Sequence, residues 1–167
     1  MFFFDESRFG THSKLGHGWF PKGKRTQVSV KQGFANFYLY SAVEPSTGEH
    51  FTLEIPNINT VCMNVFLEEM SRQYANDKII LVMDGAGWHK SKGLQVPDNI
   101  EIVLLPPYSP ELNPVERLWH YIKQNTIKNR IYSSIKEIKS SLQKFLNTIP
   151  MDVIKSLCAT NYISKVI

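Results

Sequence analysis

The sequence predicts a mixed α/β domain in which helices pack on a sheet of five strands. Two short apolar runs, residues 79–83 and 100–105, are bounded by turn-forming residues, as is typical of strands buried on both faces. An aromatic-rich run at 34–43 and a further run at 50–55 are joined by EPSTGE, which indicates an antiparallel hairpin. Segments with helical spacing of apolar residues lie between and after these runs, so the order of elements favours helices covering a mixed sheet.

The first strand is expected at residues 2–7, with Asp5 near its end. Residues 8–25 are rich in glycine and basic side chains, which predicts a loop, and the weak alternation at 26–31 favours a short additional strand. Residues 59–75 fit an amphipathic helix with Asn57 or Asn59 as its N-cap. We assign to its apolar stripe Val61, Val65, Met70 and Tyr74, with Phe66 and Leu67 beside them.

From Glu116 onwards the pattern is helical. One apolar stripe contains Val115, Leu118, Trp119 and Ile122, and another recurs within residues 135–146. A third short helix is expected at 151–158, followed by a loosely held tail. We therefore divide the chain into one domain, residues 1–150, and a C-terminal helical tail, residues 151–167.

The composition is that of a folded, moderately basic domain. Hydrophobic residues make up 43% of the chain, and no apolar run reaches the roughly 18 residues of a transmembrane helix, which predicts no membrane partner. Cys62 and Cys158 form no CxxC motif, which favours free thiols in a reducing compartment. Residues 117–167 carry 9 Lys/Arg and 2 Asp/Glu, and residues 8–31 carry six Lys/Arg and no acid. This distribution favours a polyanionic partner, with ordinary solvated lysine as the alternative.

Three acids are predicted to lie at the ends of elements. Asp5 is in the first strand, Asp84 follows the apolar run at 79–83, and Glu116 opens a helix. Carboxylates without Cys or paired His favour Mg²⁺ or Mn²⁺ over zinc, and such ions promote phosphodiester cleavage. Each acid also has a structural interpretation: Asp5 as a surface acid, Asp84 as a turn residue, and Glu116 as the capping-box acid after Asn113 and a proline.

The strings MDGAGWHKS and LLPPYSPELNPVERLW resemble the catalytic domain of the IS630 / Tc1–mariner transposases. FFFDES matches the first acidic block of that family, and GWFPKGKR is similar to the basic segment that follows it. The resemblance covers residues 1–150 and is most specific in PPYSPELNPVE. It implies a ribonuclease H-like fold with a DDE triad, in which Asp5, Asp84 and Glu116 are catalytic and bind two Mg²⁺ ions, with Mn²⁺ able to substitute.

The family's activity is cleavage of DNA at transposon ends and joining of those ends to target DNA. The expected partner is therefore double-stranded DNA, bound by a dimer, and the expected location is the bacterial cytoplasm at the nucleoid. His89 follows Asp84 by five residues, His120 lies one helical turn after Glu116, and Trp88 is a candidate for stacking on bases. The full set of candidates for supporting the acids or contacting DNA is His89, Trp88, Asn113, His120, Lys22, Lys24, Arg25, Arg117 and Lys123.

Two features depart from the family pattern. The interval between Asp84 and Glu116 is slightly shorter than usual, although both acids keep their local motifs. No helix-turn-helix precedes Asp5, so we expect a separate helix-turn-helix half as a partner. Two alternatives stay open: an inactive DNA-binding remnant, against which the three intact acids argue, and a ribonuclease H-like nuclease, against which PPYSPELNPVE argues.

Overall fold

The computed structural model describes residues 1–12, 21–23, 27 and 33–160. Within them, one sheet has the strand order β3-β2-β1-β4-β5. Its strands are β1 (Phe2–Gly10), β2 (Asn36–Val43), β3 (His50–Ile55), β4 (Ile79–Met83) and β5 (Ile100–Leu104). β1, β2 and β3 pair antiparallel, whereas β4 and β5 run parallel to β1, which confirms the predicted mixed sheet of five strands. The additional strand expected at 26–31 falls almost entirely outside the described residues.

β1 is longer than the sequence predicted, so Asp5 lies in the middle of the strand and not near its end. β2 supplies backbone partners to β1 from Phe3 as far as Gly10, and this pairing extends the strand where glycine and basic residues had indicated a loop. β4 pairs only with Phe2 and Phe3 of β1. Asp5 therefore lies immediately beyond the end of β4, level with Asp84.

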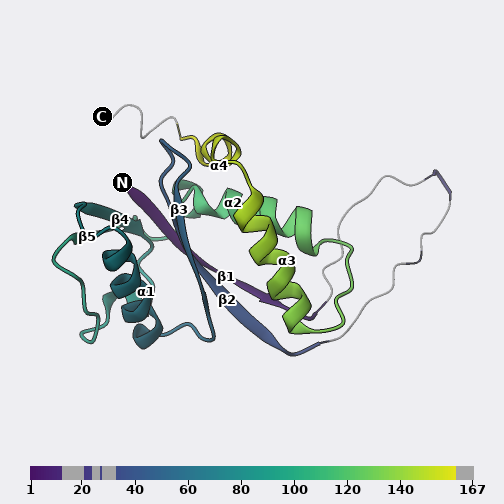
Figure 1. Cartoon of the computed structure of the whole chain (residues 1–167), viewed down its shortest axis with the longest axis horizontal. Helices are drawn as coiled ribbons and strands as arrows, with labels where there is room; N and C mark the ends of the chain where they lie inside the picture. The colour runs from purple at the N-terminus through teal and green to yellow at the C-terminus, as the bar shows by residue number, and fades with distance from the viewer. Residues whose placement is uncertain (13–20, 24–26, 28–32, 161–167) are drawn as a thin grey trace.

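Helices cover both faces of the sheet (Figure 1). One face carries α1 (Thr60–Gln73), and the other carries α2 (Val115–Ile122), α3 (Ile135–Thr148) and α4 (Met151–Cys158). Successive side chains of a strand point to opposite faces, so Phe4 packs on the α1 side and Phe3 on the α2 side. By the same alternation, Asp5 belongs to the α2 face and Glu6 to the α1 face.

α1 begins at the predicted Asn59 cap, whose side chain accepts a hydrogen bond from the Cys62 backbone N–H at 2.8 Å. Its predicted apolar stripe was wrong in part, because Val61 and Val65 are 72% and 48% exposed. At about 100° per residue these two valines lie opposite the buried side of the helix. That side consists of Met63, Phe66, Leu67 and Met70.

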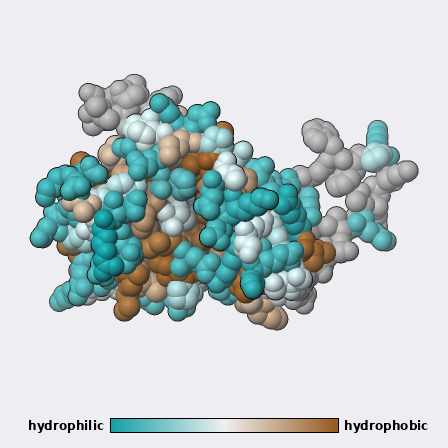
Figure 2. Space-filling view, in the orientation of Figure 1, coloured by the Kyte–Doolittle hydropathy of each residue, from teal (hydrophilic) through white to brown (hydrophobic). Residues whose placement is uncertain are grey.

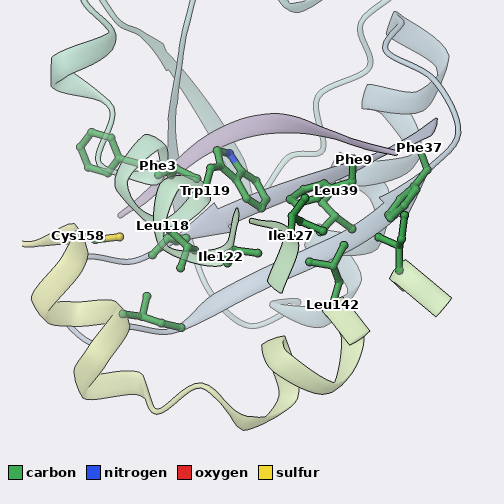
Figure 3. Close-up of a cluster of buried hydrophobic side chains, with 14 of the residues drawn as sticks. Phe3, Phe9, Phe37, Leu39, Leu118, Trp119, Ile122, Ile127, Leu142 and Cys158 are labelled. Carbon is green, nitrogen blue, oxygen red and sulfur yellow. The ribbon is translucent and has the colours of Figure 1, made fainter. Parts of the chain in front are cut away.

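α2 buries the stripe predicted for it, and α3 and α4 close over the same core. In Figure 3, Leu118, Trp119 and Ile122 of α2 lie between sheet residues such as Phe3 and the C-terminal helices. The Cys158 Sγ contacts the Pro114 carbonyl at 3.5 Å, which ties the end of α4 to the start of α2. α4 is thus part of the core that holds α2 against the sheet.

Short helical turns connect or extend the main elements. Gly87–Lys90 and Pro110–Leu112 are 3-10 helices, and Lys123–Ile127 is a π turn that continues α2. Figure 2 shows hydrophobic side chains gathered between α1 and α3, where β3 runs. Cys62 is half-buried, Cys158 is buried, and both are free thiols. None of the helices in the described ranges has the length and apolar character needed to cross a bilayer.

Candidate active site

Asp5, Asp84 and Glu116 line one cavity of about 410 Å³. Asp5 comes from the middle of β1, Asp84 follows β4, and Glu116 lies in the first turn of α2. The cavity opens where the parallel strands end, which is the edge of an α/β sheet at which ligands commonly bind. The rest of its lining comes from the segment after β4, from residues 105–110 and from Asn113. The structure therefore brings together three acids that lie far apart in the sequence.

The Asp5 carboxyl is electrostatically unfavourable as an anion. Burial, followed by the charges of Glu116, Glu6 and Asp84, raises its pKa from 3.8 to about 8. Like-charged carboxylates around a cavity favour either a proton or a cation between them. In the metal-free protein Asp5 is therefore largely protonated at neutral pH, and a divalent cation would displace that proton.

The acids share the cavity without forming a closed cage. Across the described ranges, no three His, Cys, Asp or Glu side chains already stand at metal-binding distance from one another. Asp84 and Glu116 are exposed to solvent, which leaves room for water. An all-oxygen, open and hydrated donor set suits Mg²⁺, which keeps several waters and is usually bound by only one or two carboxylates together with substrate phosphates.

Asp84 is oriented by the turn that follows it. Its Oδ1 accepts the Ala86 backbone N–H at 3.1 Å and lies 2.8 Å from His89 Nδ1. His89 Nδ1 also lies 3.0 Å from the Asp84 carbonyl oxygen. His89 therefore contacts a site acid directly, as its position in the sequence had suggested.

Glu6 is a functional candidate that the sequence reasoning missed. Its carboxylate is only 5% exposed, accepts the Trp88 indole N–H at 2.9 Å, and lies 3.0 Å from His89 Nε2. Burial lowers the pKa of His89, but the hydrogen bonds and charges of Glu6 and Asp84 together outweigh it, and the net pKa is raised. Glu6, His89 and Asp84 thus form a continuous chain of contacts. The sequence signal that could have found Glu6 was the pair of consecutive acids in a strand, because successive side chains face opposite sides of the sheet and the two acids must have different environments.

Asn113 fastens the start of α2 to β1. Its side-chain amide donates to the Phe4 carbonyl at 2.8 Å, and its Oδ1 accepts the Val115 N–H at 3.2 Å, so it satisfies a backbone donor at the start of the helix. The Asn113 backbone N–H donates to the Pro110 carbonyl at 2.9 Å. A capping-box acid would accept from that N–H, so Glu116 is left facing the cavity.

The remaining candidates lie away from the acids. His120 is exposed, contacts Gln124 at 3.3 Å and is not among the residues that line the cavity. Arg117 donates to the Ala159 carbonyl at 2.9 Å, and Lys123 lies 5.5 Å from the centre of the Phe9 ring. Lys22 is exposed, whereas Lys24 and Arg25 lie outside the described residues. Lys90 and Tyr108, which the sequence reasoning did not single out, do line the cavity.

Residues 1–139 match the family model of the DDE superfamily endonucleases. The chain is 40% identical over 102 residues to the uncharacterized protein y4pE/y4sA of Sinorhizobium fredii, covering 60% of this chain and 76% of that protein. It is 25% identical over 154 residues to the uncharacterized 39 kDa protein of insertion element IS630 from Shigella sonnei, covering 89% of this chain and 45% of that protein.

Solved structures of similar fold include two Mos1 assemblies. The Mos1 strand transfer complex aligns with a TM-score of 0.71 at 16% identity, over 94% of this chain and 50% of that chain. The Mos1 mariner paired end complex with Mn also aligns with a TM-score of 0.71 at 15% identity, over 94% of this chain and 51% of that chain. The chain thus spans about half the length of the Mos1 and IS630 proteins.

The sheet and its helices define a ribonuclease H-like domain. The chain belongs to the DDE superfamily endonucleases, since the family model covers most of its length and all three acids. The IS630 relative and the Mos1 fold together confirm the predicted resemblance to the IS630 / Tc1–mariner transposases.

Proposed function

We propose that this chain is the catalytic domain of a transposase that cleaves DNA at transposon ends and transfers the strands into target DNA. The observation that carries the proposal is the convergence of Asp5, Asp84 and Glu116 on one cavity. The family match supports nuclease chemistry. Further support comes from Mos1, whose structures are described as strand transfer and paired end complexes, the latter with Mg or Mn.

In this proposal the three acids hold two Mg²⁺ ions, for which Mn²⁺ can substitute. The fit rests on an oxygen-only donor set and on the raised pKa of Asp5, which a nearby cation would relieve. When bound, such ions activate the attacking oxygen and stabilise the leaving one.

The protein's own part is to hold the ligands in place. His89 and the Ala86 N–H orient Asp84, and Asn113 holds the first turn of α2 so that Glu116 faces Asp5. Lys90 contributes a positive charge to the same cavity, suited to a DNA phosphate.

The proposed substrate is double-stranded DNA, with a helix-turn-helix half and a dimeric assembly on DNA as the further proposed partners. Basic side chains from residues 8–31 and from α2 onward supply the expected phosphate contacts, among them Lys22, Lys24, Arg25, Arg117 and Lys123. Such a substrate places the proposed activity at the bacterial nucleoid.

Replacing Glu116 by Gln tests the assignment. Glu116 is exposed, so the variant should fold and lose no more than about 1 kcal/mol, the favourable charge at a helix start. The neutral amide binds a hard dication poorly, so Mn²⁺-dependent cleavage and joining of end DNA should fall to background. The assay uses the chain with a helix-turn-helix half supplied in trans or by fusion.

Glu111→Gln is the matched control, because Glu111 is an exposed acid of the 3-10 helix Pro110–Leu112, just before α2, and does not line the cavity. It should cleave like the wild type. Normal cleavage by Glu116→Gln would remove Glu116 from the triad. A wild-type assembly that binds DNA without cutting it would favour the inactive remnant, and cutting without joining would favour a nuclease.

A further inference from the structure

Tyr108 is the most exposed large hydrophobic residue in the described part of the chain, at 101% of its reference area. Its backbone φ is 58°, a left-handed conformation that is a genuine outlier for a bulky residue. A fully exposed aromatic ring on a residue with an unfavourable backbone conformation does not contribute to the stability of the fold. Strain of this kind clusters at functional sites, where surrounding structure maintains it.

The loop that carries Tyr108 is pinned at both ends. The Leu105 N–H donates to the Met83 carbonyl at 2.8 Å, which joins the start of the loop to β4. At the other end, the Leu112 N–H donates to the Ser109 carbonyl at 3.1 Å within the 3-10 turn, and the Asn113 side-chain amide that follows donates to the Phe4 carbonyl of β1 at 2.8 Å. Three prolines, Pro106, Pro107 and Pro110, restrict the backbone in between. The ring is therefore presented from a stiff support.

Tyr108 lines the same cavity as the three acids, and so does Lys90. The Lys90 Nζ lies 2.5 Å from the point that a Cβ on Gly85 would occupy, so the glycine leaves space for the ammonium group. One cavity thus combines carboxylates suited to cations, an ammonium suited to a phosphate, and an exposed aromatic face. A nucleotide within a DNA strand offers its phosphate to the ammonium group and to cations held by the carboxylates, and its base to the aromatic face.

We propose that Tyr108 is a stacking platform for an unpaired nucleobase beside the phosphate held in the acidic cavity. This proposal rests on the proposed function and specifies which part of the DNA contacts the site, namely an unpaired base. A base inside a duplex already has both faces stacked, so the base on Tyr108 belongs to a splayed or terminal nucleotide. Trp88, the stacking candidate from the sequence, is half-buried and donates its indole N–H to Glu6, which makes it the poorer platform.

The test compares variants of the protein on two variants of a DNA probe. The probe is a DNA hairpin duplex with a single-stranded 3′ thymidine tail, bound in Ca²⁺ so that the strand is not cut, and compared with the same probe whose tail is abasic. Tyr108→Ala should weaken binding to the thymidine tail about tenfold and leave binding to the abasic tail unchanged. Tyr108→Phe should bind both probes like the wild type, because it keeps the π face.

Two further variants separate stacking from folding. Tyr108→Gly relieves the left-handed backbone, so its Tm should equal or exceed that of the wild type while its affinity for the thymidine tail falls as for Ala. Phe34→Ala removes another exposed aromatic, 91% exposed and outside the acidic cavity, and should show no dependence on the tail bases.

The stacking proposal would be overturned if Tyr108→Ala lost affinity equally for the thymidine tail and the abasic tail, or lost no affinity for either. Metal-dependent nicking of supercoiled plasmid is measured in parallel with Asp84→Asn. If Asp84→Asn abolishes nicking while Tyr108→Ala shows no base dependence, the proposed function stands and the stacking proposal fails. Base-dependent binding by a wild-type assembly that never nicks, even with the helix-turn-helix half supplied, would leave Tyr108 as a base contact and refute the catalytic assignment.

Discussion

Asp5 and Glu6 are neighbours in the sequence, but the alternation of β1 gives their carboxylates different environments. Asp5 lies on the α2 face and lines the acidic cavity. Glu6 lies on the α1 face, buried against Trp88 and His89. The first acid is available to a ligand, whereas the second is held by two ring nitrogens and orients His89, which in turn contacts Asp84.

Glu6→Gln should therefore destabilise the protein clearly. The change removes a buried charge that accepts the Trp88 N–H and contacts His89, and hydrogen bonds to charged groups contribute about 1.5–3 kcal/mol. Urea denaturation measures the loss, and Mn²⁺ titration should show weaker binding because Asp84 loses its orientation. Glu68→Gln is the control, since Glu68 pairs with Arg72 on the exposed side of α1 and should cost less than about 1 kcal/mol. Equal costs for both variants would contradict a buried role for Glu6.

Among the elements, α2 decides the geometry of the site. It carries Glu116 in its first turn, and its position relative to β1 is set by Asn113 on one side and by the Cys158 contact of α4 on the other. Its apolar stripe, which includes Trp119, fills the core beneath the cavity. The helix is thus clamped at the end where the acid is needed.

Asn113→Ala should lose about 1–2 kcal/mol of stability and a larger share of activity. The variant lacks the cap of Val115 and leaves the buried Phe4 carbonyl without that donor. Cleavage kinetics should show a lower kcat with little change in DNA affinity, because Glu116 is displaced relative to Asp5. Asn59→Ala removes the N-cap of α1, a residue that does not line the cavity, and should cost about 1 kcal/mol without affecting cleavage. If Asn113→Ala and Asn59→Ala both lost stability but kept normal cleavage, Asn113 would act only as a helix cap.

At the scale of the whole molecule, the cavity lies where two cores meet. The core under α1 and the core under α2, α3 and α4 share the sheet, and the acids stand at the end of the parallel strands between them. Charges gathered at such a junction make the stability of the fold depend on pH and on cations.

The contribution of Asp5 to the stability of the metal-free protein should fall as pH rises from about 4 to about 8. The pKa of Asp5 is raised from 3.8 to about 8, so the folded state keeps a proton that the unfolded chain releases, and stability falls across that range. His89 acts in the same direction: its pKa is raised, so its contribution is complete below 6.5 and is lost as pH rises through its folded pKa.

Thermal melts over this range measure the effect. Asp5→Asn should flatten the profile, and millimolar Mg²⁺ or Mn²⁺ should restore stability at the alkaline end, because the cation binds the ionised carboxylates of the folded state. A profile that rises with pH in the wild type, or that Asp5→Asn leaves unchanged, would contradict the like-charge cluster.

Local features of this sequence predicted much of the fold. The apolar runs of β4 and β5, the stripe of α2, the Asn59 cap and the proline-rich turn before Glu116 are all specified within a few residues of themselves. The same local motifs singled out Asp84 and Glu116, because each stands beside turn or capping residues that end or begin an element. Asp5 was singled out by its motif FFFDES, although it lies in the middle of β1.

Contacts between distant segments decided the rest. β1 extends to Gly10 because β2 pairs with it, and α1 buries Met63 rather than Val61 because only one of its two apolar sides meets the sheet. The burial of Glu6 depends on the turn that carries His89, which lies 83 residues away. Propensity and periodicity describe one segment at a time, whereas hydrogen-bond partners, burial and charge clustering are properties of segments brought together by folding.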